Sequence, residues 1–330
     1  MCTPKDQSVS SSWTVTIPVF SVLSLILYLL RLFMKGAKFE EKATASATGK
    51  IALVTNATSS FGIETIKALN FHGAVVHMIC GNFEHGNVVR YTLENDGCDS
   101  SRLIVKCVDL RDLEQIREFA ERFRNEVGKL DILVDNTDVV LNPNIGNPMN
   151  SLRKPELGHF LLNQLMIPLL KKSENGRIVV VSSRIVDEEF LGENKKNESL
   201  CTRSYRVAKV ANSMYARELS RRLREEDPTC NIVVNSCYPG LLYSTVMANS
   251  FLTGRSWLRT LVSPFIWFCT KSLTDGIQTA LFLALSKSVK HISGKYFEEC
   301  SEKTTFVKAT NDEVNRSIYD NYLKAVGLIH

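Results

Sequence analysis

The chain is 330 residues long, 44% of them hydrophobic and 23% charged, with a formal net charge of +5. This length and composition are enough to bury one large core, and they favour one domain of roughly 280 residues with an appendage over two domains. Basic and acidic residues are mixed along the chain and the nine cysteines lack metal-site spacing, which argues against a nucleic-acid-binding protein, a metal site and a disulfide scaffold.

The first element in chain order is an uncharged apolar segment. Residues 13–34 read WTVTIPVFSVLSLILYLLRLFM, and the stretch from Trp13 to Leu30 carries no charged side chain. Such a segment nearly spans the hydrocarbon core of a bilayer, with Arg31 reaching back to the interface. We therefore predict a transmembrane anchor at residues 13–34. A cleaved signal peptide and a buried core helix are the alternatives, but neither a clear cleavage site nor a polar face is present.

The charges beside this segment predict its orientation. Arg31, Lys35 and Lys38 follow it, whereas only Lys5 and the terminal amine precede it, beside Asp6. By the positive-inside rule, the large domain then faces the cytosol. The predicted organisation is a tail at 1–12, the anchor at 13–34, a linker at 35–49 and the main domain at 50–330.

The main domain alternates strand-like and helix-like runs. Strands are predicted at residues 50–55, 74–80, 102–108, 130–135, 177–183 and 230–237. Helices are predicted after the first strand and at about 113–127 and 156–172. This rhythm predicts an α/β fold, a Rossmann-type doubly wound parallel sheet in a single domain. Ligands of such sheets bind at the carboxyl ends of the strands, so the candidate site residues are those that follow each strand.

Two residues on the helix before the sixth strand carry a chemical signal. Tyr205 and Lys209 are four positions apart and therefore share one helix face. A neighbouring ammonium lowers the pKa of a phenol from its usual value near 10. Tyr205 can then exchange a proton with an alcohol oxygen near neutral pH, while Ser183, after the fifth strand, holds that oxygen. An ordinary exposed helix pair is the alternative.

Together these residues resemble the short-chain dehydrogenase/reductase family over about residues 50–329. The stretches LGHFLLNQLMIPLLKKS, AKVANSMYARELSRRL, DGIQTALFLALS and SGKYFEEC look like its membrane-anchored retinol dehydrogenase-like branch. The resemblance implies Tyr205 as acid/base, Lys209 as the residue that lowers its pKa and grips the nicotinamide ribose, and Ser183 as the residue that orients the substrate. The implied cofactor-binding residues are Thr55, Asn56, Ser60, Gly62, Asp109, Asn136, Tyr205, Lys209, Pro239 and Gly240.

The expected cofactor loop departs from the family pattern T-G-x-x-x-G-x-G. Thr55 and Gly62 match it, but Asn56 and Ser60 replace glycines. Asparagine tolerates positive φ better than most residues. The side chain of Ser60 intrudes where backbone approaches pyrophosphate, or it caps the helix or donates a hydrogen bond to phosphate. We therefore expect the loop to bind the cofactor weakly.

Further departures lie at three other positions. Asp138 replaces the last residue of the family's N-N-A-G motif, and its charge repels phosphate. Pro155 replaces the helix asparagine whose carbonyl orders a water in a proton relay. The second strand ends in Cys80 and Gly81, where the branch carries an arginine that selects NADP. On resemblance alone we expect NADP, with NAD left open.

The resemblance implies hydride transfer between NAD(P)(H) and a lipophilic small molecule. Residues 251–270, FLTGRSWLRTLVSPFIWFCT, lie in a predicted substrate lid at about 241–272, and their apolar character suits a retinoid-, prenol- or sterol-like alcohol, aldehyde or ketone. Buried core is the alternative for this region. The implied location is a membrane such as the endoplasmic reticulum, and a homodimer remains open. The alternative function is a pseudoenzyme that keeps the fold to bind a lipid or a protein partner.

Overall fold

The structure is a computed structural model that describes residues 10–39, 46–137, 148–182, 200–244, 247, 256–304 and 311–329. The chain forms two compact units. The smaller comprises residues 1–36 and 241–275, and the larger comprises residues 37–240 and 276–330. The predicted site positions Asp138 and Ser183 lie outside the described residues.

The larger unit is built on one sheet, which has eight strands in the described part of the chain, in the order β3-β2-β1-β4-β5-β6-β7-β8. All neighbours pair in parallel except the antiparallel pair β7–β8. The strands are β1 (Ile51–Val54), β2 (Val75–Cys80), β3 (Leu103–Cys107), β4 (Ile132–Asp135), β5 (Arg177–Val181), β6 (Val233–Tyr238), β7 (Tyr296–Glu298) and β8 (Ser301–Lys303). The predicted Rossmann-type doubly wound sheet is confirmed.

The central strands consist almost entirely of buried apolar residues. β1 reads IALV, β4 reads ILVD and β5 reads RIVVV, and β4 and β5 are buried throughout. Continuous apolar runs of this kind are typical of parallel strands covered on both faces. The order of the strands reverses between β1 and β4, and open α/β sheets bind their ligands in the crevice at such a switch point.

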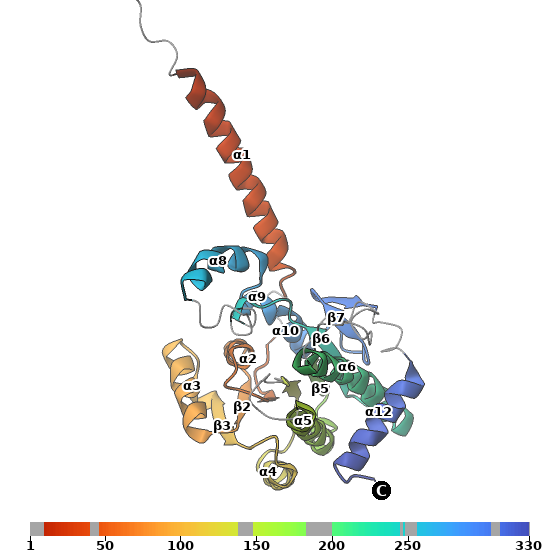
Figure 1. Cartoon of the computed structure of the whole chain (residues 1–330). Helices are drawn as coiled ribbons and strands as arrows, with labels where there is room; N and C mark the ends of the chain where they lie inside the picture. The colour runs from red at the N-terminus through yellow and green to blue at the C-terminus, as the bar shows by residue number, and fades with distance from the viewer. Residues whose placement is uncertain are drawn as a thin grey trace, which may run out of the picture. The chain divides into compact units, whose positions relative to one another are not determined.

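Helices cover both faces of the sheet (Figure 1). On one face lie α2 (Ser60–Phe71), α3 (Phe83–Asn95) and α10 (Gln278–Leu285). On the other lie α4 (Leu113–Glu126), α5 (Pro148–Leu170) and α6 (Leu200–Glu226), with α12 (Asp312–Ala325) packed on α5 and α6. The core between this second layer and the sheet includes Phe123, Leu133, Phe160 and Leu219.

A glycine allows α5 to approach the chain after β3 closely. A Cβ atom added at Gly158 would lie 1.7 Å from the carbonyl oxygen of Leu110 and 3.0 Å from Cδ1 of Ile116. Any side chain at this position would therefore push the helix away from the backbone it rests on. The close approach fixes the next residue of α5, His159, which is buried.

The smaller unit contains α1 (Ser10–Lys35) and α8 (Ser256–Cys269), and the predicted lid falls within it; the short helix α9 (Leu273–Gly276) ends just beyond it. Within the described residues, no helix combines the length and the apolarity needed to cross a membrane. The interfacial position expected for Arg31 stays a prediction. Arg31 is 7% exposed, and its guanidinium donates to the carbonyl oxygens of Phe268 and Thr270, just at the end of α8.

Candidate functional site

The loop between β1 and α2 crosses the carboxyl edge of the sheet at the switch point. The backbone N–H of Thr55 donates to Val134 of β4 (3.1 Å), and that of Ala57 donates to Ile79 of β2 (2.9 Å). Between them, Asn56 has a φ of 48°. The expectation that asparagine takes over the left-handed conformation of the missing glycine is confirmed.

The residue that caps α2 is Ser59, so the expectation that Ser60 can cap the helix is wrong. The hydroxyl oxygen of Ser59 accepts a hydrogen bond from the N–H of Gly62 (3.0 Å) and another from Nδ2 of Asn136 (2.8 Å). Ser60 is the first residue of α2 and is exposed. Ser59 and Ser60 are adjacent and both precede the apolar residues of the helix. The sequence therefore did not show which of the two serines is the cap and which is the first helical residue.

Gly62 is required by the shape of this turn. A Cβ atom at this position would lie 2.4 Å from the carbonyl oxygen of Asn56 and 3.2 Å from Cα of Ala57, both backbone atoms. The N–H groups in the first turn of a helix have no intrahelical partner, and the helix dipole adds positive potential there. The start of α2 therefore keeps the form of a phosphate-binding turn, although the Ser59 hydroxyl occupies one of its donors, Gly62.

The end of β4 is tied to this loop by a buried polar cluster. The N–H of Asn136 donates to Oγ1 of Thr55 (2.9 Å), so the residues after β1 and β4 are locked together. Nδ1 of His159 lies 3.3 Å from the same Thr55 oxygen and 2.6 Å from Oδ1 of Asp135. Asn163, one turn further along α5, donates to the other oxygen of Asp135. We call Thr55, Asp135, Thr137, His159 and Asn163 the β4 cluster.

The carboxyl group of Asp135 is ionised within this cluster. Burial alone would raise its pKa, but the charge of His159 and hydrogen bonds from His159, Thr137 and Asn163 outweigh burial and hold the pKa below its usual range. The same burial, together with the negative charge of Asp135, raises the pKa of the enclosed Tyr215 well above its usual value. Tyr215 is thus a neutral phenol beside the cluster, not an acid/base candidate.

Two further predicted positions lie at the ends of β2 and β3. Both carboxylate oxygens of Asp109 accept hydrogen bonds from the guanidinium of Arg111 (2.9 Å to each oxygen), and these bonds lower the pKa of Asp109. Cys80 is 3% exposed, and burial raises the pKa of its thiol. A Cβ atom at the adjacent Gly81 would meet nothing within 4 Å. The place where the branch carries an arginine is therefore open.

The predicted catalytic pair lies on α6, whose backbone includes positions 205 and 209. One further turn along the same side, the hydroxyl of Ser213 donates to Oγ of Ser182 (2.9 Å), the residue directly before Ser183. Pro239 and Gly240 follow β6, and Gly240 has a φ of 89° that favours glycine. The contact of Ser213 places this part of α6 at the carboxyl end of β5. The catalytic roles of Ser183, Tyr205 and Lys209 stay predictions.

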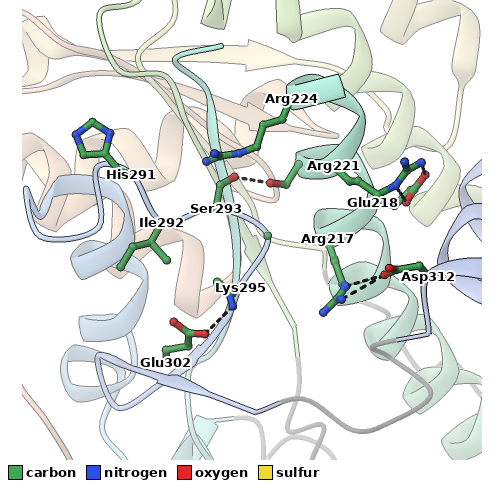
Figure 2. Close-up of a pocket in the computed structure, with 12 residues that line it drawn as sticks. Arg217, Glu218, Arg221, Arg224, His291, Ile292, Ser293, Lys295, Glu302 and Asp312 are labelled. Carbon is green, nitrogen blue, oxygen red and sulfur yellow. Dashed lines mark hydrogen bonds and ion pairs between the residues drawn. The ribbon is translucent and has the colours of Figure 1, made fainter. Parts of the chain in front are cut away.

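A separate cleft of about 590 Å³ lies beside the carboxyl-terminal half of α6 (Figure 2). Two of its cations form ion pairs, Arg217 with Asp312 (3.2 Å) and Lys295 with Glu302 (3.0 Å). Arg221 likewise contacts the buried Glu218. None of the predicted site residues lines this cleft.

Comparisons with known proteins agree with this arrangement. A family model described as short chain dehydrogenase matches residues 50–255. Retinol dehydrogenase 12 of Mus musculus is 31% identical over 286 residues, and retinol dehydrogenase 14 of Mus musculus is 32% identical over 300 residues. Each alignment covers 85% of this chain and 87% of the relative.

A solved structure shares the fold. A 7α-hydroxysteroid dehydrogenase complexed with NADH and 7-oxo glycochenodeoxycholic acid superposes with a TM-score of 0.58 at 23% identity, over 77% of this chain and 93% of that chain. The family model, the relatives and the order of the strands lead to one assignment. The chain belongs to the short-chain dehydrogenase/reductase family, in its retinol dehydrogenase-like branch, and is an NAD(P)-dependent oxidoreductase.

Proposed function

We propose that this protein moves a hydride between NADP(H) and a lipid alcohol, aldehyde or ketone at a membrane. The observation that carries the proposal is the turn between β1 and α2, which keeps a left-handed residue at Asn56 (φ 48°) and a required glycine at Gly62 although two family glycines are replaced. The relatives named retinol dehydrogenase support a retinoid-like substrate class.

The residues of the turn fit a dinucleotide. The first turn of α2 offers backbone N–H groups to a pyrophosphate, and the lock between Thr55 and Asn136 holds that turn against β4. Against the fit stand the side chain of Ser60, the charge of Asp138 and the donor that Ser59 occupies. An unfavourable contact of about 1.4–2.8 kcal/mol weakens binding tenfold to a hundredfold. We therefore propose a functional but weak cofactor site.

The nicotinamide, when bound, supplies or accepts the hydride. In our proposal Tyr205 gives a proton to the substrate oxygen, or takes one from it. Lys209 favours the phenolate form of Tyr205 because an ammonium stabilises a neighbouring negative charge. Ser183 holds the substrate oxygen by a hydrogen bond. The contact between Ser213 and Ser182 supports this placement, because it fixes α6 against the strand end that precedes Ser183.

We propose NADP as the preferred cofactor and a cytosol-facing domain at the endoplasmic reticulum membrane. The NADP preference rests on the family resemblance alone, because this chain has Gly81 where the branch usually has the arginine that selects NADP. The membrane location is supported by the uncharged segment from Trp13 to Leu30 and by the positive charges that follow it. Protease protection of intact microsomes tests the topology, and a protected main domain would refute it.

Nucleotide titration and one substitution test the proposed chemistry. The purified full chain is titrated with NADPH and NADH by calorimetry, with dissociation constants of tens to hundreds of micromolar expected, tenfold to a hundredfold above a micromolar site. Tyr205→Phe should reduce turnover of a lipid aldehyde by about 10²–10⁴. Tyr91→Phe, at an exposed position on α3, is the matched control.

Two outcomes would overturn the proposal. If a folded chain binds neither nucleotide at millimolar concentration, the pseudoenzyme alternative explains the degenerate loop better. If Tyr205→Phe keeps activity within twofold of the wild type, the proton transfer lies elsewhere. The variant Ser60→Gly tests the contribution of Ser60 to the weak binding. Tighter nucleotide binding in that variant would identify the side chain of Ser60 as the unfavourable contact in the loop.

A further inference from the structure

We propose that α8 is a second membrane contact, which lies in the plane of the bilayer with its apolar side in the boundary between headgroups and acyl chains. The inference rests on the proposed membrane location, and it assigns to residues 256–269 a lipid partner in addition to their predicted part in the substrate lid. The partner is a phospholipid surface and not a protein groove.

The exposed side of α8 is a continuous apolar stripe. Trp257, Leu261 and Phe265 follow one another at four-residue spacing and are 70%, 70% and 72% exposed. Trp267, near the end of the helix, is 52% exposed. Side chains four residues apart are neighbours on a helix surface, so the stripe runs along most of the length of α8. Large exposed apolar patches of this kind mark interaction surfaces in water-soluble domains.

The opposite side of α8 and its end are held by polar contacts. The hydroxyl of Ser263 lies 2.7 Å from the hydroxyl of Tyr243, which fixes the middle of the helix within the smaller unit. Arg31 of α1 donates to the carbonyl oxygen of Phe268 (3.2 Å) and to that of Thr270 (2.7 Å). A cation at the carboxyl end of a helix also interacts favourably with the helix dipole.

These contacts join α8 to the segment proposed to enter the membrane. The guanidinium of Arg31 is also stacked over the ring of Trp267, 4.4 Å from its centroid. The preceding residues of α1 are apolar and exposed on all sides, from Leu25 (56%) to Leu30 (48%). Figure 1 shows α8 beside the carboxyl-terminal end of α1, within the same unit. The stripe on α8 therefore continues the apolar surface of α1 at the point where α1 ends.

Composition favours a lipid surface as the partner. Arg259 is the one charged residue in the sequence SWLRTLVSPFIWFC, whereas protein interfaces usually surround an apolar centre with a polar, charged rim. Tryptophan and phenylalanine are the side chains that interfacial helices place in the headgroup–acyl boundary. A helix of 14 residues, about 21 Å long, is too short to cross a bilayer but long enough to lie on one.

Tryptophan fluorescence can test this contact in the full chain, because the sequence has three tryptophans. The variant Trp13→Phe/Trp267→Phe retains Trp257 alone. It is bound to phosphatidylcholine vesicles with brominated acyl chains. We expect a blue shift and an approximately twofold loss of emission, because interfacial helices bury their apolar face about 5–10 Å into the boundary. Flotation of the vesicles reports separately on membrane attachment.

The matched control places the reporter on another exposed helix. Tyr91, in α3 of the larger unit, is 58% exposed, and Tyr91→Trp in a background without the native tryptophans should not be quenched. Leu261→Asp, added to the variant that retains Trp257, should abolish the quenching while flotation persists through α1. Unchanged nucleotide affinity in each variant shows that the larger unit is folded.

The outcomes distinguish this inference from the proposed anchor. If the protein floats with the vesicles but the emission of Trp257 is as little quenched as that of the Tyr91→Trp control, the inference about α8 is overturned and the proposed anchor is retained. Loss of flotation together with unquenched Trp257 would overturn both. Quenching that survives Leu261→Asp would also overturn the inference, because the stripe would then not be the surface that meets the lipid.

Discussion

The replacement Asp135→Asn removes the buried charge of the β4 cluster and almost preserves the shape of the side chain. Three hydrogen bonds reach this carboxylate, from His159 (2.6 Å), Thr137 (2.8 Å) and Asn163. Because the pKa of Asp135 is held below its usual range, the attractions outweigh the cost of burying the charge. The ionised group therefore contributes net stability above its unfolded pKa, near 4, and loses that contribution as the pH falls through its folded pKa.

The expected loss of stability follows from the hydrogen bonds whose acceptor changes from a charged carboxylate to a neutral amide. A hydrogen bond to a charged group contributes about 1.5–3 kcal/mol and a neutral one about 0.5–1.5 kcal/mol, so the bonds from His159 and Thr137 to the remaining oxygen each weaken by about 1 kcal/mol. The bond from Asn163 is lost, because the amide NH2 group of asparagine cannot accept it. Relief of the buried charge offsets part of this loss. We expect a decrease of about 1–3 kcal/mol in the free energy of unfolding at pH 7, and a Tm lower by about 2–4 °C for each kcal/mol.

The same change should weaken the cofactor site. His159 touches both Asp135 and Thr55, and Thr55 holds the N–H of Asn136, so the lock between the β1 and β4 loops loosens when the carboxylate is lost. A loss of about 1.4 kcal/mol in this arrangement corresponds to a tenfold higher dissociation constant for NADPH. Urea denaturation and NADPH titration, both on the full chain, measure the two effects.

The matched control lies at the opposite end of the same strand. Asp131 is also buried, and its carboxylate accepts from the N–H of Ile51 (2.9 Å) and from the hydroxyl of Ser173 (2.5 Å). Asp131→Asn should lower stability comparably but leave nucleotide affinity unchanged, because it lies away from the carboxyl edge of the sheet. Equal losses of affinity in both variants, or an Asp135→Asn protein as stable as wild type, would refute the reasoning.

Three further changes test separate features. Gly158→Ala should lower the free energy of unfolding by about 2 kcal/mol through overpacking. Gly128→Ala, whose added Cβ would meet nothing within 4 Å, should change it by no more than about 0.5 kcal/mol, and chemical denaturation measures both. Gly81→Arg should tighten NADPH about tenfold relative to NADH in parallel titrations, and equal affinities would refute a phosphate contact there. Burial, aided by the charge of Lys106, lowers the pKa of His77 to about 4, so the folded state stays neutral while the unfolded state gains a proton. Stability is therefore complete above about pH 6.5 and falls by up to about 3 kcal/mol towards pH 4, and His77→Phe should flatten this slope in pH-dependent melting curves.

The sheet was predictable because its strands are long buried runs separated by helices. Each of the six predicted strands is present, with boundaries that differ by a few residues, as expected where strand ends carry polar residues. The strands β7 and β8 were missed because each has three residues, too few to establish a period. Helix α3 was missed because its buried positions Gly86, Val89 and Leu93 form only a narrow apolar stripe.

The site was predictable where chain order identifies the carboxyl ends of the strands. Asn56 and Gly62 lie in the expected turn, and Asn136 contacts Thr55 as a residue of the same edge should. The β4 cluster was missed because it unites the end of β4 with His159 of α5, which a histidine in an apolar helix pattern does not reveal. Its signal in the sequence was the acidic residue at position 135, in a strand otherwise wholly apolar.

The β7–β8 hairpin has a consequence for self-association. Its two-residue turn, Glu299 and Cys300, has φ values of 52° and 54°, the left-handed pair that suits a tight hairpin. The outer strand β8 reads SEK, and all three residues are exposed. An exposed edge strand can recruit strands of other molecules, but short length and charge oppose this. The hairpin thus ends this side of the sheet with a strand too short and too charged to serve as a template, which disfavours edge-to-edge aggregation through β8.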